Sequence, residues 1–149
     1  MKSRDHLHSH NELPGMLDLI IPAAFDEISE IVSVKSPDHT ILFYNRAGYK
    51  MLGLEPEDVI GRKCYEIIGC PTFCSNCAGA RVVITKKSDR AESYFESIGK
   101  WFEINAMPVC NKEGKVIFVL EILRDITNLK KLEEQIAKYE AQEVPTSRQ

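Results

Sequence analysis

The chain has 149 residues, of which 44% are hydrophobic and 28% are charged, and its formal net charge is −3. This composition is typical of a globular domain and excludes a disordered chain. The negative balance argues against direct nucleic-acid binding and against electrostatic attachment to anionic membranes.

The sequence predicts no membrane partner. A spanning helix needs about 20 predominantly apolar residues, and the apolar stretches of this chain, such as 116–120, are much shorter. The N-terminus is polar where a signal peptide would carry an apolar run. We therefore expect a cytoplasmic protein, in which the five cysteines stay reduced.

The N-terminal part of the chain predicts a tail and one helix. Residues 1–13 are polar, and we expect them to be a disordered tail. Residues 14–30 predict a helix, because apolar residues recur at steps of three and four. Pro22 lies inside this stretch and favours a kink or a break. The apolar stripe consists of Leu17, Ile20, Ile21, Phe25 and Ile28.

The next part of the chain predicts strands followed by short helices. Residues 31–44 are rich in β-branched and aromatic residues on either side of a turn, which is typical of two strands. Asn45 is a suitable N-cap for a helix that ends at Gly53. Pro56 begins another short helical turn, and a further helix is expected from about Ala78.

Three strands and a helix are predicted in the C-terminal half. Strands 91–98 and 100–109 are joined by a tight turn at Gly99, and a third strand covers 115–124. Residues 126–142 return to helical spacing and carry a short heptad seam. The seam consists of Leu129, Leu132, Ile136 and Tyr139.

This order of elements predicts an α+β fold. Two strands and then three, from distant parts of the chain, can form one five-stranded antiparallel sheet, with the short helices covering one of its faces. The first and last helices then flank the sheet. Their apolar stripes predict a homodimer that forms through these flanking helices.

A cluster of cysteines provides the most distinctive chemistry. Cys64, Cys70, Cys74 and Cys77 fall within fourteen residues, with five, three and two residues between them. Four thiolates are the donor set that zinc or an iron–sulfur cluster requires. We predict a metal site with these four ligands and place an oxygen-labile iron–sulfur cluster before zinc. Because the spacing is not that of a common zinc or ferredoxin motif, free thiols remain an alternative.

The same cysteines allow a different class of function. Cys74 and Cys77 form a Cys-x-x-Cys pair in front of a predicted helix, as in a thiol–disulfide oxidoreductase. No buried strand leads into the pair, as a thioredoxin fold would need. Heme is disfavoured because residues 60–90 contain no histidine that could be an axial ligand.

The strand at 100–109 offers a second candidate site. Alternate residues lie on opposite faces of a strand, and one of the two faces should line a cavity. The sequence does not determine which face is buried. We take as the candidate ligand cavity the face that carries Trp101, Glu103, Asn105 and Met107.

The chain resembles a PAS domain over about residues 14–142. The resemblance rests on the order and spacing of five short motifs: Ile41-Leu42-Phe43-Tyr44-Asn45-Arg46-Ala47, Leu52-Gly53-Leu54, Glu57-Asp58-Val59-Ile60-Gly61-Arg62-Lys63, Trp101-Phe102-Glu103-Ile104 and Asp125-Ile126-Thr127. It implies a sensor domain at 14–127, followed at 128–149 by a signalling helix and a polar end. The implied fold is a five-stranded sheet curled around a cavity.

The resemblance also implies a function and a partner. PAS domains sense redox state, oxygen or small ligands and are not themselves enzymes. Asp125 and Thr127 would pass a change in the sheet to the helix that follows. The implied partner is an output domain or protein, such as a histidine kinase, in two-component or transcriptional signalling.

The resemblance bears on the cysteines as well. Some PAS domains carry a Cys-Tyr followed by a Cys-x-x-Cys pair, and Cys64-Tyr65 with Cys74 and Cys77 matches that layout, leaving Cys70 as an addition. Light-sensing flavin PAS domains carry a reactive cysteine in a run similar to 61–64. Flavin is disfavoured here, because the residues that follow differ from those that contact it.

Overall fold

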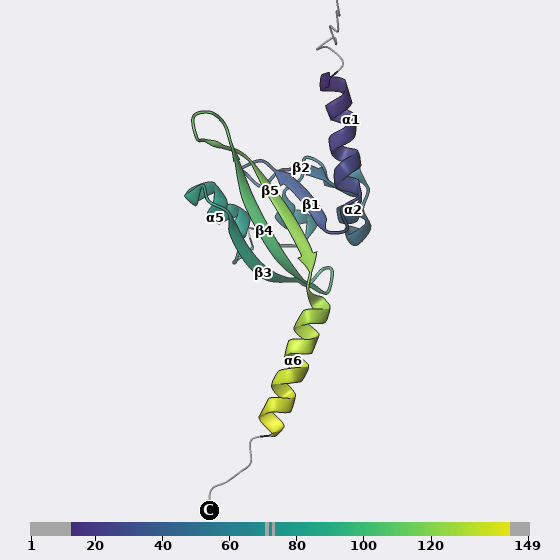
Figure 1. The fold of residues 1–149 in the computed structure, drawn as a ribbon, viewed down its shortest axis with the longest axis vertical. Coiled ribbons are helices and arrows are strands. Elements are labelled where there is room, and N and C mark those ends of the chain that lie inside the picture. The colour runs from purple at the N-terminus through teal and green to yellow at the C-terminus, as the bar shows by residue number, and fades with distance from the viewer. Residues whose placement is uncertain (1–12, 71, 73, 144–149) are drawn as a thin grey trace, which may run out of the picture.

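The computed structural model describes residues 13–70, 72 and 74–143 (Figure 1). The predicted tail at 1–13, apart from Leu13, and the chain end at 144–149 therefore lie outside the described residues. The elements are α1 (Leu13–Asp26), β1 (Ile31–Lys35), β2 (Ile41–Tyr44), α2 (Arg46–Leu52), α3 (Pro56–Val59), α4 (Cys64–Ile67), α5 (Ala78–Thr85), β3 (Asp89–Phe95), β4 (Lys100–Cys110), β5 (Val116–Asp125) and α6 (Thr127–Gln142).

The strands form one antiparallel sheet in the order β2-β1-β5-β4-β3. The last strand, β5, lies in the centre and joins the two halves of the chain. It places Glu121 opposite Ser33 of β1 and Leu123 opposite Ile104 of β4. The predicted five-stranded antiparallel sheet is therefore confirmed.

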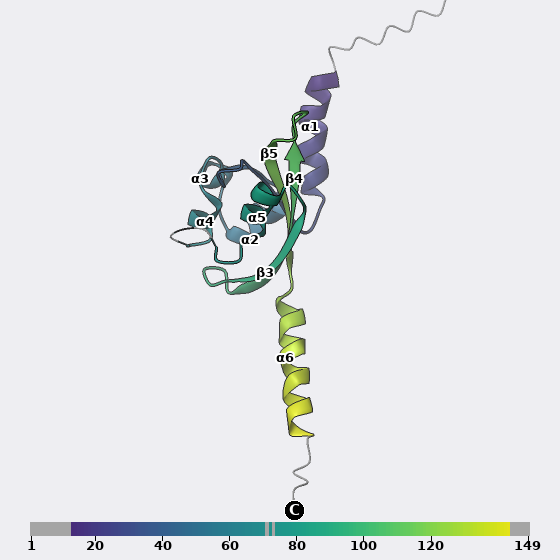
Figure 2. The same ribbon diagram turned by 90° about the vertical axis from the view of Figure 1, so that its left-hand side faces the viewer.

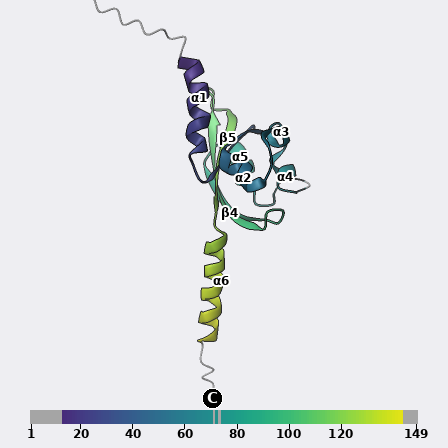
Figure 3. The ribbon, with the colours of Figure 1, turned by 90° about the vertical axis from the view of Figure 1, so that its right-hand side faces the viewer.

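Helices α2 to α5 cover one face of this sheet, whereas α1 lies on the other side (Figures 2 and 3). The hydrophobic core fills the space between the sheet and these four short helices. Ile41, Val59, Val82 and Phe102 are each 0% exposed there. Helices α1 and α6 extend from opposite ends of the domain (Figure 1). The predicted covering of one face by short helices and the flanking terminal helices are both confirmed.

Asn45 joins three parts of the fold through its side chain, which is 0% exposed. Its Oδ1 accepts hydrogen bonds from the backbone N–H groups of Gly48, at 3.2 Å, and Val32, at 3.0 Å. The first of these bonds caps α2, as the sequence predicted. Its Nδ2 donates to the carbonyl oxygens of Phe25, Ile28 and Glu30, at 2.9, 3.2 and 2.9 Å. The segment that follows α1 is thereby held against β1 and α2.

The first helix is shorter than predicted, and Pro22 lies inside it as part of one continuous helix. The proline removes the hydrogen bond that the carbonyl of Asp18 would accept. Asp18 is exposed, so water can satisfy that carbonyl. Within the described part of the chain, no helix is both long and apolar enough to cross a membrane.

Candidate functional site

A small, partly open pocket of about 40 Å³ lies between the inner face of the sheet and the helices α4 and α5. Such a volume holds a few water molecules or a very small ligand. The pocket combines apolar walls with an unusual number of ionisable groups. These are Lys35, Tyr44, Cys64, Cys74, Cys77 and Glu121.

A buried ion pair forms one wall of the pocket. Lys35 Nζ lies 2.8 Å from Glu121 Oε1, and the two side chains are only 4% and 9% exposed. Burial lowers the pKa of Lys35, but the adjacent Glu121 carboxylate raises it to a final value well above the usual one. Lys35 is therefore held in its charged form by the carboxylate beside it.

Gly79, in the first turn of α5, lets this helix approach the ion pair closely. A Cβ at position 79 would lie 2.5 Å from Glu121 Oε1 and 3.3 Å from Lys35 Nζ. The backbone at this position is helical and has a negative φ. Glycine is therefore needed here for space rather than for backbone conformation.

We expect Gly79→Ala to destabilise the domain by about 1–3 kcal/mol, because the added methyl overpacks a buried site whose neighbours are held by their mutual charge. Urea denaturation would measure the change. The matched control is Gly15→Ala in α1, where the added Cβ has no neighbour within 4 Å beyond the adjacent residues and the helix's own backbone. That change should be neutral or stabilising. Equal stabilities of Gly79→Ala and the unchanged protein would contradict this packing.

Cys64 is held beside the ion pair. Its Sγ accepts a hydrogen bond from Lys35 Nζ at 3.5 Å and lies 4.0 Å from His39 Nδ1. Burial raises the pKa of the Cys64 thiol, and the Lys35 ammonium opposes this shift only in part. Burial and the nearby Lys35 charge both lower the pKa of His39. The Cys64 thiol is therefore stabilised in its neutral form despite the ammonium beside it.

Cys77 occupies the N-cap position of α5. Its Sγ accepts the backbone N–H of Ala80 at 3.3 Å. Cys74 lies on the wall of the same pocket. Burial raises the pKa of Cys74 to about 12, with further contributions from the nearby Cys70 and Cys77 and from a hydrogen bond with Cys70.

The four cysteines of the predicted metal site are therefore only partly brought together. Cys64, Cys74 and Cys77 line the pocket of about 40 Å³, whereas Cys70 lies in a neighbouring groove of about 290 Å³, which Cys74 also lines. Among the residues that the structure describes, no three His, Cys, Asp or Glu side chains are placed to hold a metal ion. The metal site stays a prediction.

The residues of β4 that we predicted as a ligand cavity lie on the other face of the sheet from the core. The inner face of β4 is formed by Phe102, Ile104 and Ala106. The opposite face carries the predicted set, Trp101, Glu103, Asn105 and Met107. Of this strand, Ile104 lines the pocket. Trp101 lines the groove of about 290 Å³, and Asn105 and Met107 line a surface groove of about 420 Å³. A ligand cavity at Trp101, Glu103, Asn105 and Met107 therefore stays a prediction. The strand period defines two faces but does not say which of them is buried.

Sequence reasoning missed Lys35 and Glu121. A signal for Glu121 was present, because it is the one charge in the otherwise apolar run 116–123. A charge within a strand of that kind is buried only if it has a partner. The partner could not be identified, since Lys35 lies on a strand from the other half of the chain.

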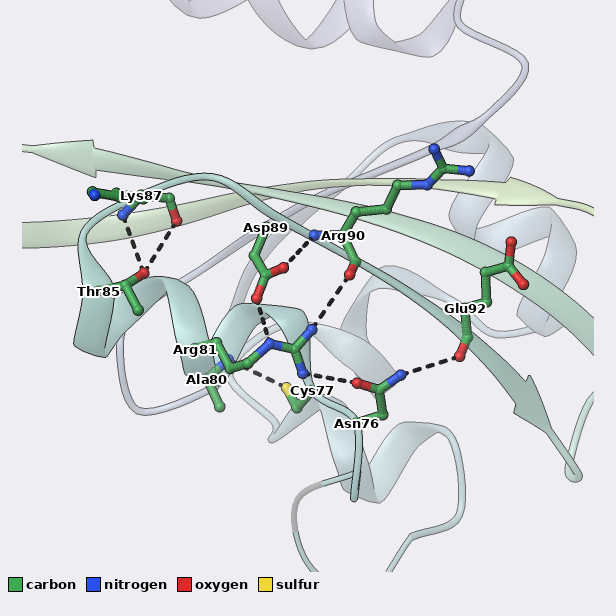
Figure 4. A network of polar contacts seen from close by, with 9 residues as sticks. All are labelled: Asn76, Cys77, Ala80, Arg81, Thr85, Lys87, Asp89, Arg90 and Glu92. Carbon is green, nitrogen blue, oxygen red and sulfur yellow. Dashed lines mark hydrogen bonds and ion pairs between the residues drawn. The ribbon is translucent and has the colours of Figure 1, made fainter.

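A polar network ties the cysteine segment to the edge of the sheet (Figure 4). The Arg81 guanidinium pairs with Asp89 and donates to Asn76 Oδ1 at 2.8 Å and to the carbonyl of Arg90 at 3.4 Å. Asn76 Nδ2 in turn donates to the carbonyl of Glu92 at 3.5 Å. Arg81 and Asn76 thereby satisfy two carbonyls of the edge strand β3, and Asn76 lies between Cys74 and Cys77.

The predicted relay residues connect α6 to the start of β4. Asp125 Oδ1 accepts the Thr127 N–H at 2.9 Å, and Thr127 Oγ1 accepts the backbone N–H of Trp101 at 3.1 Å. Burial raises the pKa of Asp125, but hydrogen bonds from Lys100 and Thr127 outweigh this and hold it at about 2. Lys130 attaches α6 to the sheet at a second point.

This second attachment lies one turn further along α6. Lys130 Nζ pairs with the Glu92 carboxylate of β3 and lies 5.4 Å from the centre of the Trp101 ring. A cation over an aromatic face is attracted by the negative potential of the ring. Helix α6 is therefore held to both β3 and β4.

Solved structures share this architecture. An RNA-binding light-oxygen-voltage receptor is 20% identical with a TM-score of 0.65, and the match covers 95% of this chain and 41% of that chain. The PAS domain of Bordetella pertussis BvgS is 16% identical (TM-score 0.59, covering 89% and 98%). The photoactive yellow protein domain of the sensor histidine kinase Ppr from Rhodospirillum centenum is 21% identical (TM-score 0.54, covering 74% and 97%). These identities show the fold alone.

A family model gives the assignment. The model described as PAS domain matches residues 29–128, which is the sheet with its four short helices and the first residues of α6. All five sequence motifs that pointed to this family fall inside that range. The chain belongs to the PAS domain family.

Proposed function

We propose that this PAS domain senses redox state, oxygen or a small ligand at the pocket between the sheet and helices α4 and α5. The observation that carries the proposal is the combination of a buried ion pair with the thiols of Cys64, Cys74 and Cys77 around one small space. Buried charges are rare in protein interiors and occur preferentially where chemistry or signalling needs them. Any change in charge or oxidation state in the pocket acts directly on the central strands β1 and β5.

The proposed output is helix α6. Asp125 and Thr127 link its first turn to β4, so a shift of the sheet changes the position of the helix. The sensor histidine kinase from Rhodospirillum centenum is an example of a protein in which a domain of this fold occurs. We propose that α6 passes the signal to an output domain or partner protein of that kind.

The double variant Asp125→Ala, Thr127→Val tests the relay. We expect the amides in the first turns of α6 to exchange with deuterium at least tenfold faster, because the hydrogen bonds that fix the helix to β4 are lost. The amides around the pocket should keep their protection. Lys138→Ala, which removes an exposed ion pair within α6, is the control and should have little effect on the first turn. Unchanged exchange in the double variant would show that these residues do not hold α6.

As an alternative, we propose that the domain senses its signal through a metal held by Cys64, Cys70, Cys74 and Cys77. Thiolate sulfur suits both zinc and iron–sulfur clusters, and binding would need the Cys70–Cys77 segment to rearrange. Metal analysis and visible spectra after anaerobic purification distinguish an iron–sulfur cluster, a zinc ion and a protein without metal. A brown protein that bleaches in air indicates a cluster, a colourless one with stoichiometric zinc indicates a structural metal, and the absence of both metals removes this proposal.

Thiol–disulfide exchange at Cys74 and Cys77 is the competing function. Cys77 at the N-terminus of α5 favours it, because the helix N–H groups can stabilise a thiolate. Robust insulin reduction that is lost in Cys74→Ser would support the enzyme. Absence of turnover would leave the sensor as the function.

We further propose a homodimer through the terminal helices. Their apolar stripes are exposed: Leu17, Ile20 and Ile21 in α1 are each 49% exposed, and Ile136 in α6 is 56% exposed. Because α1 and α6 extend from opposite ends (Figure 1), a parallel pair of chains would place each helix against its own copy. Light scattering at micromolar concentration should report a dimer, and a monomer would contradict the proposal.

A further inference from the structure

Glu92 and Tyr94 of β3 and Trp101 of β4 form an acidic and aromatic patch on the outer face of the sheet. Tyr94 lies opposite Trp101 in the strand register, and Glu92 is two residues from Tyr94, so the three side chains share that face. The centres of the Tyr94 and Trp101 rings are 5.7 Å apart. All three residues line the groove of about 290 Å³, a volume close to that of the smallest typical small-molecule sites.

The ammonium of Lys130 shows which kind of group this patch holds. Its Nζ pairs with the Glu92 carboxylate and lies 5.4 Å from the centre of the Trp101 ring. Aromatic faces attract cations, and the carboxylate supplies the counter-charge. Among the described residues that line the groove, Glu92 is the only charged one. The patch therefore combines the groups that recognise an alkylammonium ion, and α6 supplies such an ion from within the chain.

We propose that Glu92, Tyr94 and Trp101 bind a small organic ammonium ion, which displaces Lys130 and loosens α6. This inference goes beyond the proposed function, because it needs neither an oxidant nor a metal. Its three side chains also lie on the opposite face of the sheet from the core.

The exchange of one cation for another leaves Lys130 with a partner. Its Nζ also lies 3.4 Å from the carboxylate of Glu133 on the same helix, so the ammonium keeps a counter-charge after it leaves Glu92. Helix α6 then loses its ion pair with β3 and keeps the hydrogen bond between Thr127 and β4. Binding at the patch therefore changes how firmly α6 is held to the sheet.

The patch favours organic ammonium ions over small inorganic cations. The alkyl groups of such a ligand bury apolar surface against the rings of Tyr94 and Trp101, which is favourable, whereas a hydrated sodium ion has no such surface. The probe is n-butylammonium, because it carries the carbon stem and the ammonium of a lysine side chain. Butanol has nearly the same shape without the charge and is the neutral control.

Fluorescence of the full chain measures binding at the patch directly, because Trp101 is the only tryptophan in the sequence. The protein is titrated with n-butylammonium chloride at constant ionic strength, and with butanol and sodium chloride in parallel. We expect a saturable change in Trp101 emission with n-butylammonium and none with either control. An equal change with sodium chloride would show only screening of the ion pair, and an equal change with butanol would show an apolar site. Either result overturns the inference.

Substitutions separate the role of the carboxylate from that of the internal lysine. Lys130→Met should tighten binding at least about tenfold, because apparent affinity is reduced by the fraction of molecules in which the site is not available. Glu92→Gln should abolish saturable binding, because the counter-charge is lost. Lys138→Met, which removes an exposed ion pair of α6, is the matched control and should bind like the unchanged protein. Unchanged affinity in Lys130→Met or in Glu92→Gln would overturn the inference.

Hydrogen exchange tests the effect on α6. At saturating n-butylammonium, the amides in the first turns of α6 should exchange faster in the unchanged protein. The ligand should have no such effect in Lys130→Met, in which the ion pair with β3 is already absent. Binding that leaves the exchange of α6 as it was would overturn the release of the helix. Failure of binding at the patch would remove this inference and leave the proposal for the cysteine pocket standing.

Discussion

Replacing Glu121 with leucine should destabilise the domain by about 3–5 kcal/mol, because it leaves the Lys35 ammonium buried without a counter-charge. The two groups lie 2.8 Å apart, with side chains 4% and 9% exposed, so the ammonium has little access to bulk water once the carboxylate is gone. Urea denaturation at neutral pH measures the change. For a domain of ordinary stability this is a large share of the total.

The double variant Lys35→Met, Glu121→Leu separates the loss of charge balance from the loss of packing. Replacing both partners by apolar residues of similar size should recover most of the stability, because no charge then remains buried. Lys138→Ala removes an exposed ion pair in α6 and should leave stability nearly unchanged. A Glu121→Leu effect as small as that of Lys138→Ala would show that the pair is not held as described.

Asn45→Ala is the second change with a large expected effect. The side chain makes five hydrogen bonds to backbone groups of β1, α2, the last turn of α1 and the segment after α1. A buried polar group that loses its partner costs about 1–3 kcal/mol, so we expect a total loss of about 3 kcal/mol or more. The end of α1 should also become more sensitive to protease, because its carbonyl contacts are lost.

Asn111→Ala is the matched control for this prediction. Asn111 also accepts two backbone hydrogen bonds, from Glu113 at 3.1 Å and Lys115 at 2.9 Å, but in an exposed turn. Water can take over those donors, so the loss of stability should be clearly smaller. Equal effects of the two variants would contradict the role given to Asn45 in joining the three segments.

Local signals predicted most of the fold. Asn45 and Gly53 bound α2 as expected, because capping depends on neighbouring residues and, at Gly53, on a left-handed backbone with φ of 65°. The strands were identified from their composition, and the start of α5 at Ala78 was placed correctly. The helix α4 was not predicted, since four residues are too few to show a helical period.

Long-range features could not be predicted from the same signals. The pairing of Lys35 with Glu121 depends on β1 lying next to β5, and no local pattern encodes that neighbourhood. The buried face of β4 depends in the same way on which side the helices cover. For the cysteines, spacing predicted proximity but not which sulfur contacts Lys35, which one caps α5 and which residues line the neighbouring groove.

We propose that chemistry in the cysteine segment reaches α6, because Asn76 and Arg81 link this segment to β3 and Lys130 links β3 to α6. Hydrogen exchange of the unchanged protein, measured with and without one equivalent of hydrogen peroxide, tests this proposal. We predict faster exchange in β3 and in the first turns of α6 after oxidation. Both changes should be absent when the four clustered cysteines are replaced by serine. Oxidation of these thiols that leaves every amide of β3 and α6 at its original exchange rate would contradict the proposal.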